Sequence, residues 1–120
     1  MSIENYIEYL NLTEKKHSPK ELFIEGNEEF LYHKRRVSVV GSRKASKDGL
    51  KRASIVAKAL VEHDIIVVSG LAAGIDTMAH TTAIKNGGQT IAVLGTPLDK
   101  TYPKENFELL NEIKKNHLAI

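Results

Sequence analysis

Three short runs of β-branched and aliphatic residues, each followed closely by glycine, constrain most narrowly how this chain can fold. They are Val37–Val40, Ile65–Val68 and Ile91–Leu94. Between the first two, from about Lys47 to His63, apolar residues recur at the spacing of one helix face. Strands that alternate with helices in this way form right-handed βαβ crossovers in a parallel sheet. The sequence therefore predicts an α/β fold with a three-layer, Rossmann-like parallel sheet and flanking helices.

The remaining segments predict further elements around this sheet. A second helix is expected after the glycine-rich turn Ser69–Gly74, with its end marked by Asn86-Gly87-Gly88. A third helix is expected from Asn106 to Lys115, and a last strand at Leu118–Ile120. The first 35 residues carry only weak periods. They predict a short amphipathic helix at Ile3–Leu10 that is broken by Ser18-Pro19, and then a short strand, a turn and a helical turn within residues 22–31. We therefore expect residues 1–35 to be a lead-in packed on a single domain of residues 36–120.

The composition narrows the class of protein. The 120 residues are 42% hydrophobic and 27% charged, which is typical of one soluble globular domain. The chain has no cysteine, no apolar run of the ~20 residues that cross a bilayer, and acidic residues where a signal peptide would be basic. These features predict a cytoplasmic protein with no membrane partner.

The charge is more informative in its distribution than in its total of +2. Residues 1–36 hold six basic and seven acidic side chains, whereas residues 37–120 hold eleven and eight. From Lys34 to Arg52 there are eight basic residues against the single acid Asp48. This cluster could bind phosphates, but on charge alone a solvated helix face with a linker explains it better.

The loop after the first predicted strand contains Gly41-Ser42-Arg43, followed by Lys44. In open parallel sheets, ligands bind beyond the carboxyl ends of the strands, close to helix N-termini that favour anions. Glycine permits a close approach to the backbone, serine offers a hydroxyl, and arginine offers a fork of donors matched to phosphate. A plain turn with a surface arginine is the alternative.

The loop after the second strand is Ser69-Gly-Leu-Ala-Ala-Gly-Ile-Asp76, which is more specific. Gly70 and Gly74 open the backbone for an anion, although the segment is neither a dinucleotide fingerprint nor a Walker motif. Asp76 is expected to complement the helix dipole rather than to act in catalysis. Asp76 and His80 share a helix face, but two such ligands do not make a metal site, and a structural hydrogen bond is the better explanation.

The loop after the third strand supplies Thr96, Tyr102 and Lys104. Tyr102 could stack on a base or pack the loop down, and Lys104 could contact a phosphate. No catalytic motif and no nucleophile with a nearby base can be recognised. We therefore expect a binding protein rather than an enzyme, with no cofactor and no metal.

Four segments in order resemble the DprA/Smf DNA-processing family: LFIEGN, VSVVGSRKAS, VVSGLAAGIDTMAH and NGGQTIAVLGTPLDKTYPKEN. The resemblance runs from about Leu22 to the end. It implies a Rossmann-like domain that binds single-stranded DNA, forms a homodimer and helps to load RecA on incoming DNA during natural transformation. It also implies that Gly41, Ser42, Arg43, Ser69 and Gly70 line a DNA-backbone pocket. The positions of Gly74, Asp76 and His80 would shape that pocket.

Members of that family continue beyond the position of Ile120 with a lysine, an aromatic residue and an Arg-Asn-Arg stretch in the same pocket. The chain is therefore expected to be partial relative to the family domain, as a fragment or as a natural short homologue. The candidate DNA- or phosphate-binding residues are Gly41, Ser42, Arg43, Lys44, Ser69, Gly70, Gly74, Thr96, Tyr102 and Lys104, with Asp76 and His80 as pocket-shaping residues.

Two other functions remain open at this stage. The first is a nucleoside monophosphate phosphoribohydrolase of the lysine-decarboxylase-like (LOG) type. Its P-G-G-x-G-T loop is not matched by Gly87-Gly88-Gln89-Thr90. The second is a small-nucleotide-binding module or scaffold whose glycine loops serve packing.

Overall fold

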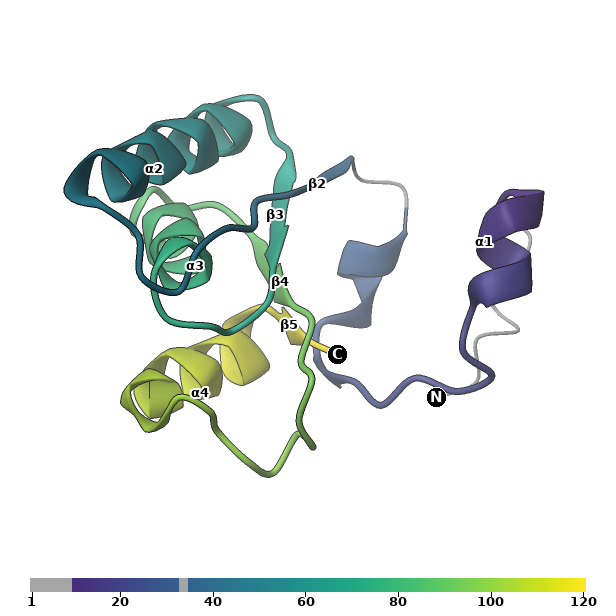
Figure 1. The fold of residues 1–120 in the computed structure, drawn as a ribbon. Coiled ribbons are helices and arrows are strands. Elements are labelled where there is room, and N and C mark those ends of the chain that lie inside the picture. Colours follow the sequence, from purple (N-terminus) through teal and green to yellow (C-terminus); the bar gives the residue numbers. More distant parts are fainter. Residues whose placement is uncertain (1–9, 33–34) are drawn as a thin grey trace.

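The computed structural model describes residues 10–32 and 35–120, and at its centre is a five-stranded sheet in the order β1-β5-β4-β3-β2 (Figure 1). The strands are β1 (Glu25–Gly26), β2 (Arg36–Ser38), β3 (Ile66–Ser69), β4 (Thr90–Ala92) and β5 (Leu118–Ala119). From β2 to β5 every pairing is parallel, which confirms the predicted βαβ arrangement. Strand β1 pairs antiparallel with β5, so the sheet is mixed at that edge.

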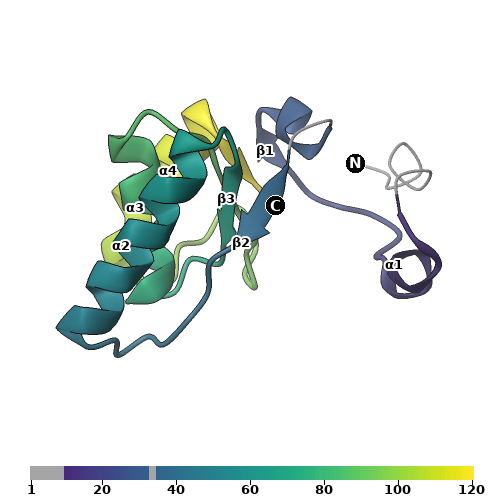
Figure 2. The ribbon, with the colours of Figure 1, turned by 90° about the horizontal axis from the view of Figure 1, so that it is seen from above.

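Three helices, α2 (Lys47–Glu62), α3 (Ile75–Lys85) and α4 (Phe107–Asn116), form the crossovers between the parallel strands. Successive strands lie side by side in chain order, so the crossovers return on the same side. Figure 2 shows all three helices on one face of the sheet. Two short 3₁₀ helices, η2 (Glu28–Leu31) and η3 (Lys104–Asn106), complete the elements of the domain.

Each face of the sheet has its own core. On the helix side, Val67 of β3 packs with Ala57 of α2 and with Ala79 and Ala83 of α3. These small side chains let the two helices approach the sheet and each other closely. On the opposite face, Phe30 of η2 packs with Ile66, Ile91 and Leu118. The 3₁₀ helix η2 therefore covers part of the sheet face opposite the three helices.

The predicted helix over Ile3–Leu10 lies, apart from Leu10, outside the described residues. The helix that the structure shows in this region is α1 (Leu12–His17), which stands apart from the sheet in both ribbon views (Figures 1 and 2). It begins with a capping box: the Asn11 side chain accepts from the Glu14 amide, and the Glu14 carboxylate accepts from the Asn11 amide. It ends at Ser18, where the sequence predicts a break. Within residues 10–32 and 35–120, no helix has the length and hydropathy of a membrane span.

Candidate functional site

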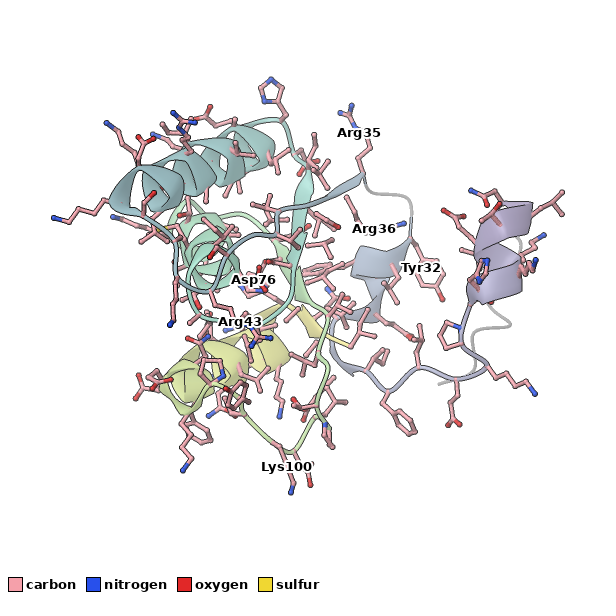
Figure 3. All side chains as sticks on the ribbon, in the orientation of Figure 1. Tyr32, Arg35, Arg36, Arg43, Asp76 and Lys100 are labelled. Carbon is pink, nitrogen blue, oxygen red and sulfur yellow. The ribbon has the colours of Figure 1, made fainter. Side chains whose placement is uncertain are left out.

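The loops that follow β2, β3 and β4 meet at the carboxyl edge of the sheet, because parallel strands end at the same edge. They enclose a pocket of about 360 Å³. Its lining residues are Arg43 from the first loop, Gly70, Leu71, Ala72, Ala73 and Asp76 from the second, and Val93, Leu94, Gly95, Thr96, Tyr102 and Pro103 from the third. Figure 3 shows Arg43 and Asp76 in the same region of the molecule. This is the ligand position that the topology predicts.

The first loop is a tight turn that presents Arg43. The Ser42 hydroxyl oxygen accepts a hydrogen bond from the Lys44 amide at 3.1 Å. Two residues after Lys44, the Ser46 side chain accepts from the Gly49 amide at 3.0 Å and caps α2. Arg43 and Lys44 are both exposed, and Arg43 lines the pocket. The serine therefore shapes the turn, while the arginine fork remains available to a ligand.

The second loop is packed against the first. Gly74 has φ +83°, and a Cβ on it would overlap the carbonyl oxygen of Ser42 and lie 2.8 Å from that of Arg43. The Ile75 amide donates to the same Ser42 carbonyl at 3.2 Å. Only glycine fits this combination of backbone conformation and close approach. Gly74 therefore joins the two loops instead of lining the pocket.

Asp76 lies in the pocket wall in the first turn of α3 and is only 7% exposed. Its Oδ2 accepts a long hydrogen bond of 3.3 Å from the Ala72 amide. Its Oδ1 is buried and has no hydrogen-bond partner among the described residues. A Cβ on Gly70 would lie 2.7 Å from Oδ2, so that glycine makes room for the carboxylate.

His80 is fully buried behind the pocket, between α3 and the sheet. Burial lowers its pKa below the ordinary value of 6.5, against the raising effects of the Gly70 hydrogen bond and the Asp76 charge. Nε2 of the neutral ring donates to the Gly70 carbonyl at 2.5 Å, because a carbonyl oxygen can only accept. Nδ1 lies 2.6 Å from the Thr90 hydroxyl, which also lies 2.9 Å from the Val67 carbonyl. His80 thus fixes the carbonyl of Gly70 in the loop after β3.

The third loop contributes Thr96, Tyr102 and Pro103 to the pocket. Tyr102 is 67% exposed at the rim, so its ring is not packed down under the loop. Lys104 is exposed in η3 and does not line the pocket.

Asn106 holds this loop in place, although no sequence pattern marks it as a site residue. Its buried Nδ2 donates to the Leu71 carbonyl and to the Thr77 hydroxyl oxygen, both at 3.0 Å. The Thr77 hydroxyl donates in turn to the Ala72 carbonyl at 2.8 Å. The network connects the start of α4 to the loop after β3. A lone asparagine before a helix predicts a cap that faces the solvent, whereas this side chain makes no cap hydrogen bond and points inward.

The structure separates the described residues of the basic cluster into three places. Arg35 and Arg36 lie at the amino end of β2, well away from Arg43 (Figure 3). Arg36 donates to the carbonyls of Phe30 and Leu31, so part of the cluster serves the fold. Lys47, Lys51 and Arg52 lie on the exposed side of α2, where Arg52 pairs with Asp48 at 3.1 Å. Of this cluster, Arg43 is the residue that lines the pocket.

Among the candidate residues, the pocket brings together Arg43, Gly70, Asp76, Thr96 and Tyr102. Gly41, Ser42, Lys44, Ser69, Gly74, His80 and Lys104 lie outside its lining. Ser69 is buried and donates to the Val39 carbonyl at 2.6 Å, so its hydroxyl is used within the sheet. Across the described ranges, no group of three or more histidine, aspartate or glutamate side chains is arranged to hold a metal ion.

The comparison with protein families matches residues 3–120 to the family of DNA recombination-mediator protein A. The DNA processing protein DprA of Streptococcus pneumoniae is 47% identical over 92% of this chain and 38% of the relative. That of Bacillus subtilis is 33% identical over 85% of this chain and 34% of the relative. The chain therefore spans little more than a third of the length of these two relatives.

Two solved structures have the same fold. The structure of DNA processing protein A from Streptococcus pneumoniae superposes with a TM-score of 0.76 and 48% identity over 81% of this chain and 34% of that one. The Helicobacter pylori protein, whose structure concerns a unique single-stranded DNA binding mode, superposes with a TM-score of 0.76 and 29% identity. That match covers 84% of this chain and 46% of the other.

Proposed function

The chain belongs to the DNA recombination-mediator protein A family, and from that premise we propose that it binds single-stranded DNA in DNA processing. The observation that carries the proposal is the pocket at the carboxyl edge of the sheet, with the exposed Arg43 and Tyr102 at its rim. Single-stranded DNA is typically bound by a cation that contacts the backbone and an aromatic ring that stacks on a base. The pocket combines both.

In this proposal Arg43 contacts a phosphate of the strand, and Lys44 adds charge beside it. Both side chains are exposed on the loop that follows β2. A guanidinium can bind two phosphate oxygens at once, and such charge-assisted hydrogen bonds are stronger than neutral ones. Since phosphates are alike in every sequence, this contact supplies affinity without sequence preference.

Binding without catalysis fits the side chains around the pocket. Histidine is a common general base in enzymes. His80, however, is buried behind the pocket, and both of its ring nitrogens have hydrogen-bond partners. Among the residues that the structure describes, no serine or lysine lines the pocket, and the one threonine in its lining, Thr96, is not paired with a base there. These features favour DNA binding over hydrolysis of a nucleoside monophosphate.

Several wider parts of the proposal follow the family resemblance. We propose a cytoplasmic protein that acts in natural transformation and supports RecA loading, with residues 36–120 as the DNA-binding domain and residues 1–35 as its N-terminal lead-in, which contacts the sheet through Phe30. We also propose a homodimer, because Val37 is exposed in the edge strand β2 and Val40 is exposed just after it. Unpaired sheet edges with apolar side chains favour self-association. Light scattering that shows a monomer at high concentration would contradict the dimer.

The DNA-binding proposal is tested by fluorescence anisotropy with a labelled single-stranded oligonucleotide over a salt series. We expect an affinity that falls as the salt concentration rises, because bound cations displace counterions from the phosphates. Mononucleotides as competitors and an assay for nucleotide hydrolysis distinguish the alternatives. Tight binding of a mononucleotide, or its hydrolysis, without binding of the oligonucleotide would contradict the proposal.

A further inference from the structure

A second hollow, on the helix layer, is not used by the proposed DNA binding. It lies between α2 and α3, which pack against each other on one face of the sheet (Figures 1 and 2). Its volume is about 470 Å³. The lining includes polar and charged side chains and a methionine from the two helices and the cap of α3: Ser54, Lys58, Met78, Thr82, Lys85 and Asn86. None of these residues lines the pocket at the carboxyl edge of the sheet. We call this hollow the helix groove.

The charge of the helix groove is positive. Lys58 comes from α2 and Lys85 from α3, and both side chains are exposed. Neither forms an ion pair among the described residues, whereas Arg52 of α2 pairs with Asp48. Within the described part of the chain, no aspartate or glutamate lines the groove. Two cations that border one hollow without a neutralising acid attract an anion.

Neutral hydrogen-bond donors lie beside the two lysines. The Ser54 hydroxyl oxygen accepts from the Thr82 hydroxyl at 3.2 Å, which leaves the hydrogen of Ser54 available to a ligand. The Asn86 side chain donates one N–H to the Thr82 carbonyl at 2.8 Å and has a second N–H to offer. Lysine, serine and asparagine side chains are common donors to phosphate oxygens. The groove therefore has the donors of a phosphate site.

The two lysines favour one kind of phosphate. A phosphate monoester carries a charge of about −1.5 to −2 at pH 7, because its second pKa is close to 6. The phosphodiester of a nucleic acid strand carries a single negative charge. One lysine neutralises a diester, whereas Lys58 and Lys85 together match the dianion of a monoester. The charge of the groove thus suits a small phosphate monoester better than the DNA backbone.

The size of the helix groove leaves room for more than the phosphate. Its volume is within the range of about 300–1,000 Å³ that is usual for small-molecule pockets. Met78 is half-buried in the lining, and its flexible apolar side chain can adapt to an organic group. The methylene stems of the two lysines can cover the sides of that group.

We propose that the helix groove binds a small phosphate monoester, with the phosphate between Lys58 and Lys85 and the organic part against Met78. A nucleoside monophosphate has this chemistry, and inorganic phosphate has its charged part alone. The groove shares no lining residue with the DNA pocket, so both sites can be occupied at once. The inference goes beyond the proposed DNA binding and does not depend on it.

The test titrates the full chain with AMP at low salt and follows the backbone amide signals by NMR, because the measurement has to locate the ligand. We expect the largest shifts within residues 78–86. Cyclic AMP keeps the base and the sugar but is a diester, so it should bind about tenfold more weakly, the usual loss for a charge-assisted hydrogen bond. Adenosine should cause no shifts in the groove. Inorganic phosphate should shift the same amides with a lower affinity than AMP.

Four variants check the residues. Lys58→Gln and Lys85→Gln should each weaken AMP binding by about tenfold. Lys115→Gln is the matched control for Lys85→Gln, because both remove a cation from the last turn of a helix, and it should bind AMP as the parent does. Arg43→Ala removes the cation of the DNA pocket and should leave the shifts in the groove unchanged. All four side chains are exposed, and circular dichroism checks that each variant is folded.

Several outcomes would overturn the inference. Shifts by AMP that are confined to the loops after β2, β3 and β4 would place the ligand in the DNA pocket. Equal affinities for AMP and cyclic AMP would show that the dianion is not recognised, and equal affinities for AMP and inorganic phosphate would remove the organic part. Shifts within residues 78–86 with an oligonucleotide but not with AMP would make the groove a nucleic acid surface. Each of these results leaves the DNA pocket to be judged by its own anisotropy test.

Discussion

Gly74 lies so close to Ser42 that a methyl group on its Cα would overlap the serine carbonyl oxygen. Its φ of +83° is also one that L-residues rarely adopt. We therefore predict that Gly74→Ala destabilises the chain by about 2 kcal/mol or more, since the backbone conformation alone costs roughly 1–2 kcal/mol. Because the substitution pushes the first two loops apart, it should also weaken DNA binding. Urea denaturation and anisotropy measure the two effects.

A matched control for this prediction is Gly87→Ala. Gly87 also has a positive φ, +75°, but no atom lies within 4 Å of the Cβ that alanine would add. The free energy of unfolding of the control variant should therefore fall by only about 1 kcal/mol, the cost of the backbone conformation, and its DNA affinity should equal that of the parent. Equal losses of stability at the two positions would show that the close approach to Ser42 contributes nothing.

Arg43→Ala should weaken the binding of every single-stranded sequence by roughly ten- to a hundredfold, the usual effect of losing a charge-assisted hydrogen bond. The loss should be uniform because the contact is to a phosphate. The salt dependence should become shallower by about 0.7 in log–log slope, the contribution of one phosphate in a single strand.

Two further variants sharpen the Arg43 prediction. Arg43→Lys should restore only part of the affinity, because lysine keeps the charge and loses the fork. Lys58→Ala removes an exposed cation from α2 that does not line the pocket, so it should leave binding nearly unchanged. Equal affinities of Arg43→Ala and the parent across the salt series would place the DNA elsewhere on the molecule.

Asn106→Ala should destabilise the chain by about 1–3 kcal/mol, because the buried acceptors at Leu71 and Thr77 lose their donor. The same change frees the loop that carries Tyr102, so DNA binding should weaken as well. Asn116→Ala is a suitable control, since its side chain bonds Glu112 at the surface and should contribute little. Urea denaturation that gives the same loss for both variants would contradict the proposed role of Asn106.

Two buried histidines predict a loss of stability in mild acid. Burial lowers the pKa of both His80 and His117 from 6.5, although the charge of Glu112 partly raises that of His117. The unfolded chain therefore takes up protons below about pH 6.5 before the folded chain does, and the free energy of unfolding falls as the pH falls. Urea denaturation between about pH 7.5 and 5.5 should show this decrease.

The variant His117→Leu isolates one of the two groups. Nδ1 of His117 is buried and has no hydrogen-bond partner in the described part of the chain, and the ring lies against Phe30, so leucine keeps the apolar contact and removes the titration. The slope of stability against pH should become shallower by up to about 1.4 kcal/mol per unit, the contribution of one proton. Parallel pH profiles for the variant and the parent would show that His117 does not titrate in this range.

The strands and crossover helices could be predicted because burial imposes the pattern that identifies them. The predicted runs Ile65–Val68 and Ile91–Leu94 overlap the observed strands β3 and β4, and their ends differ from those of the strands by one or two residues. The helix predicted from Lys47 begins there, because Ser46 provides the cap. Parallel topology then brings three loops to one edge, so the place of the site followed from the order of the elements.

The features that could not be predicted depend on contacts between distant residues. The antiparallel strand β1 requires Gly26, since a Cβ there would overlap the carbonyl oxygen of His117. No residue pattern around Gly26 predicts its close approach to His117. The inward turn of Asn106 and the unpartnered oxygen of Asp76 likewise depend on which loops become neighbours. The cap of α1 is different, because Asn11 and Glu14 already have the spacing of a capping box.

The three walls of the pocket come from three different βα units of the chain. A strand of DNA bound in the pocket would contact all three units, which are otherwise joined through the sheet. By mass action, a ligand that binds only the folded chain raises its stability by about 2.7 kcal/mol at a hundred times the dissociation constant. The melting temperature should therefore rise with the concentration of the oligonucleotide. The protein would therefore be most resistant to proteolysis while single-stranded DNA is bound in the pocket.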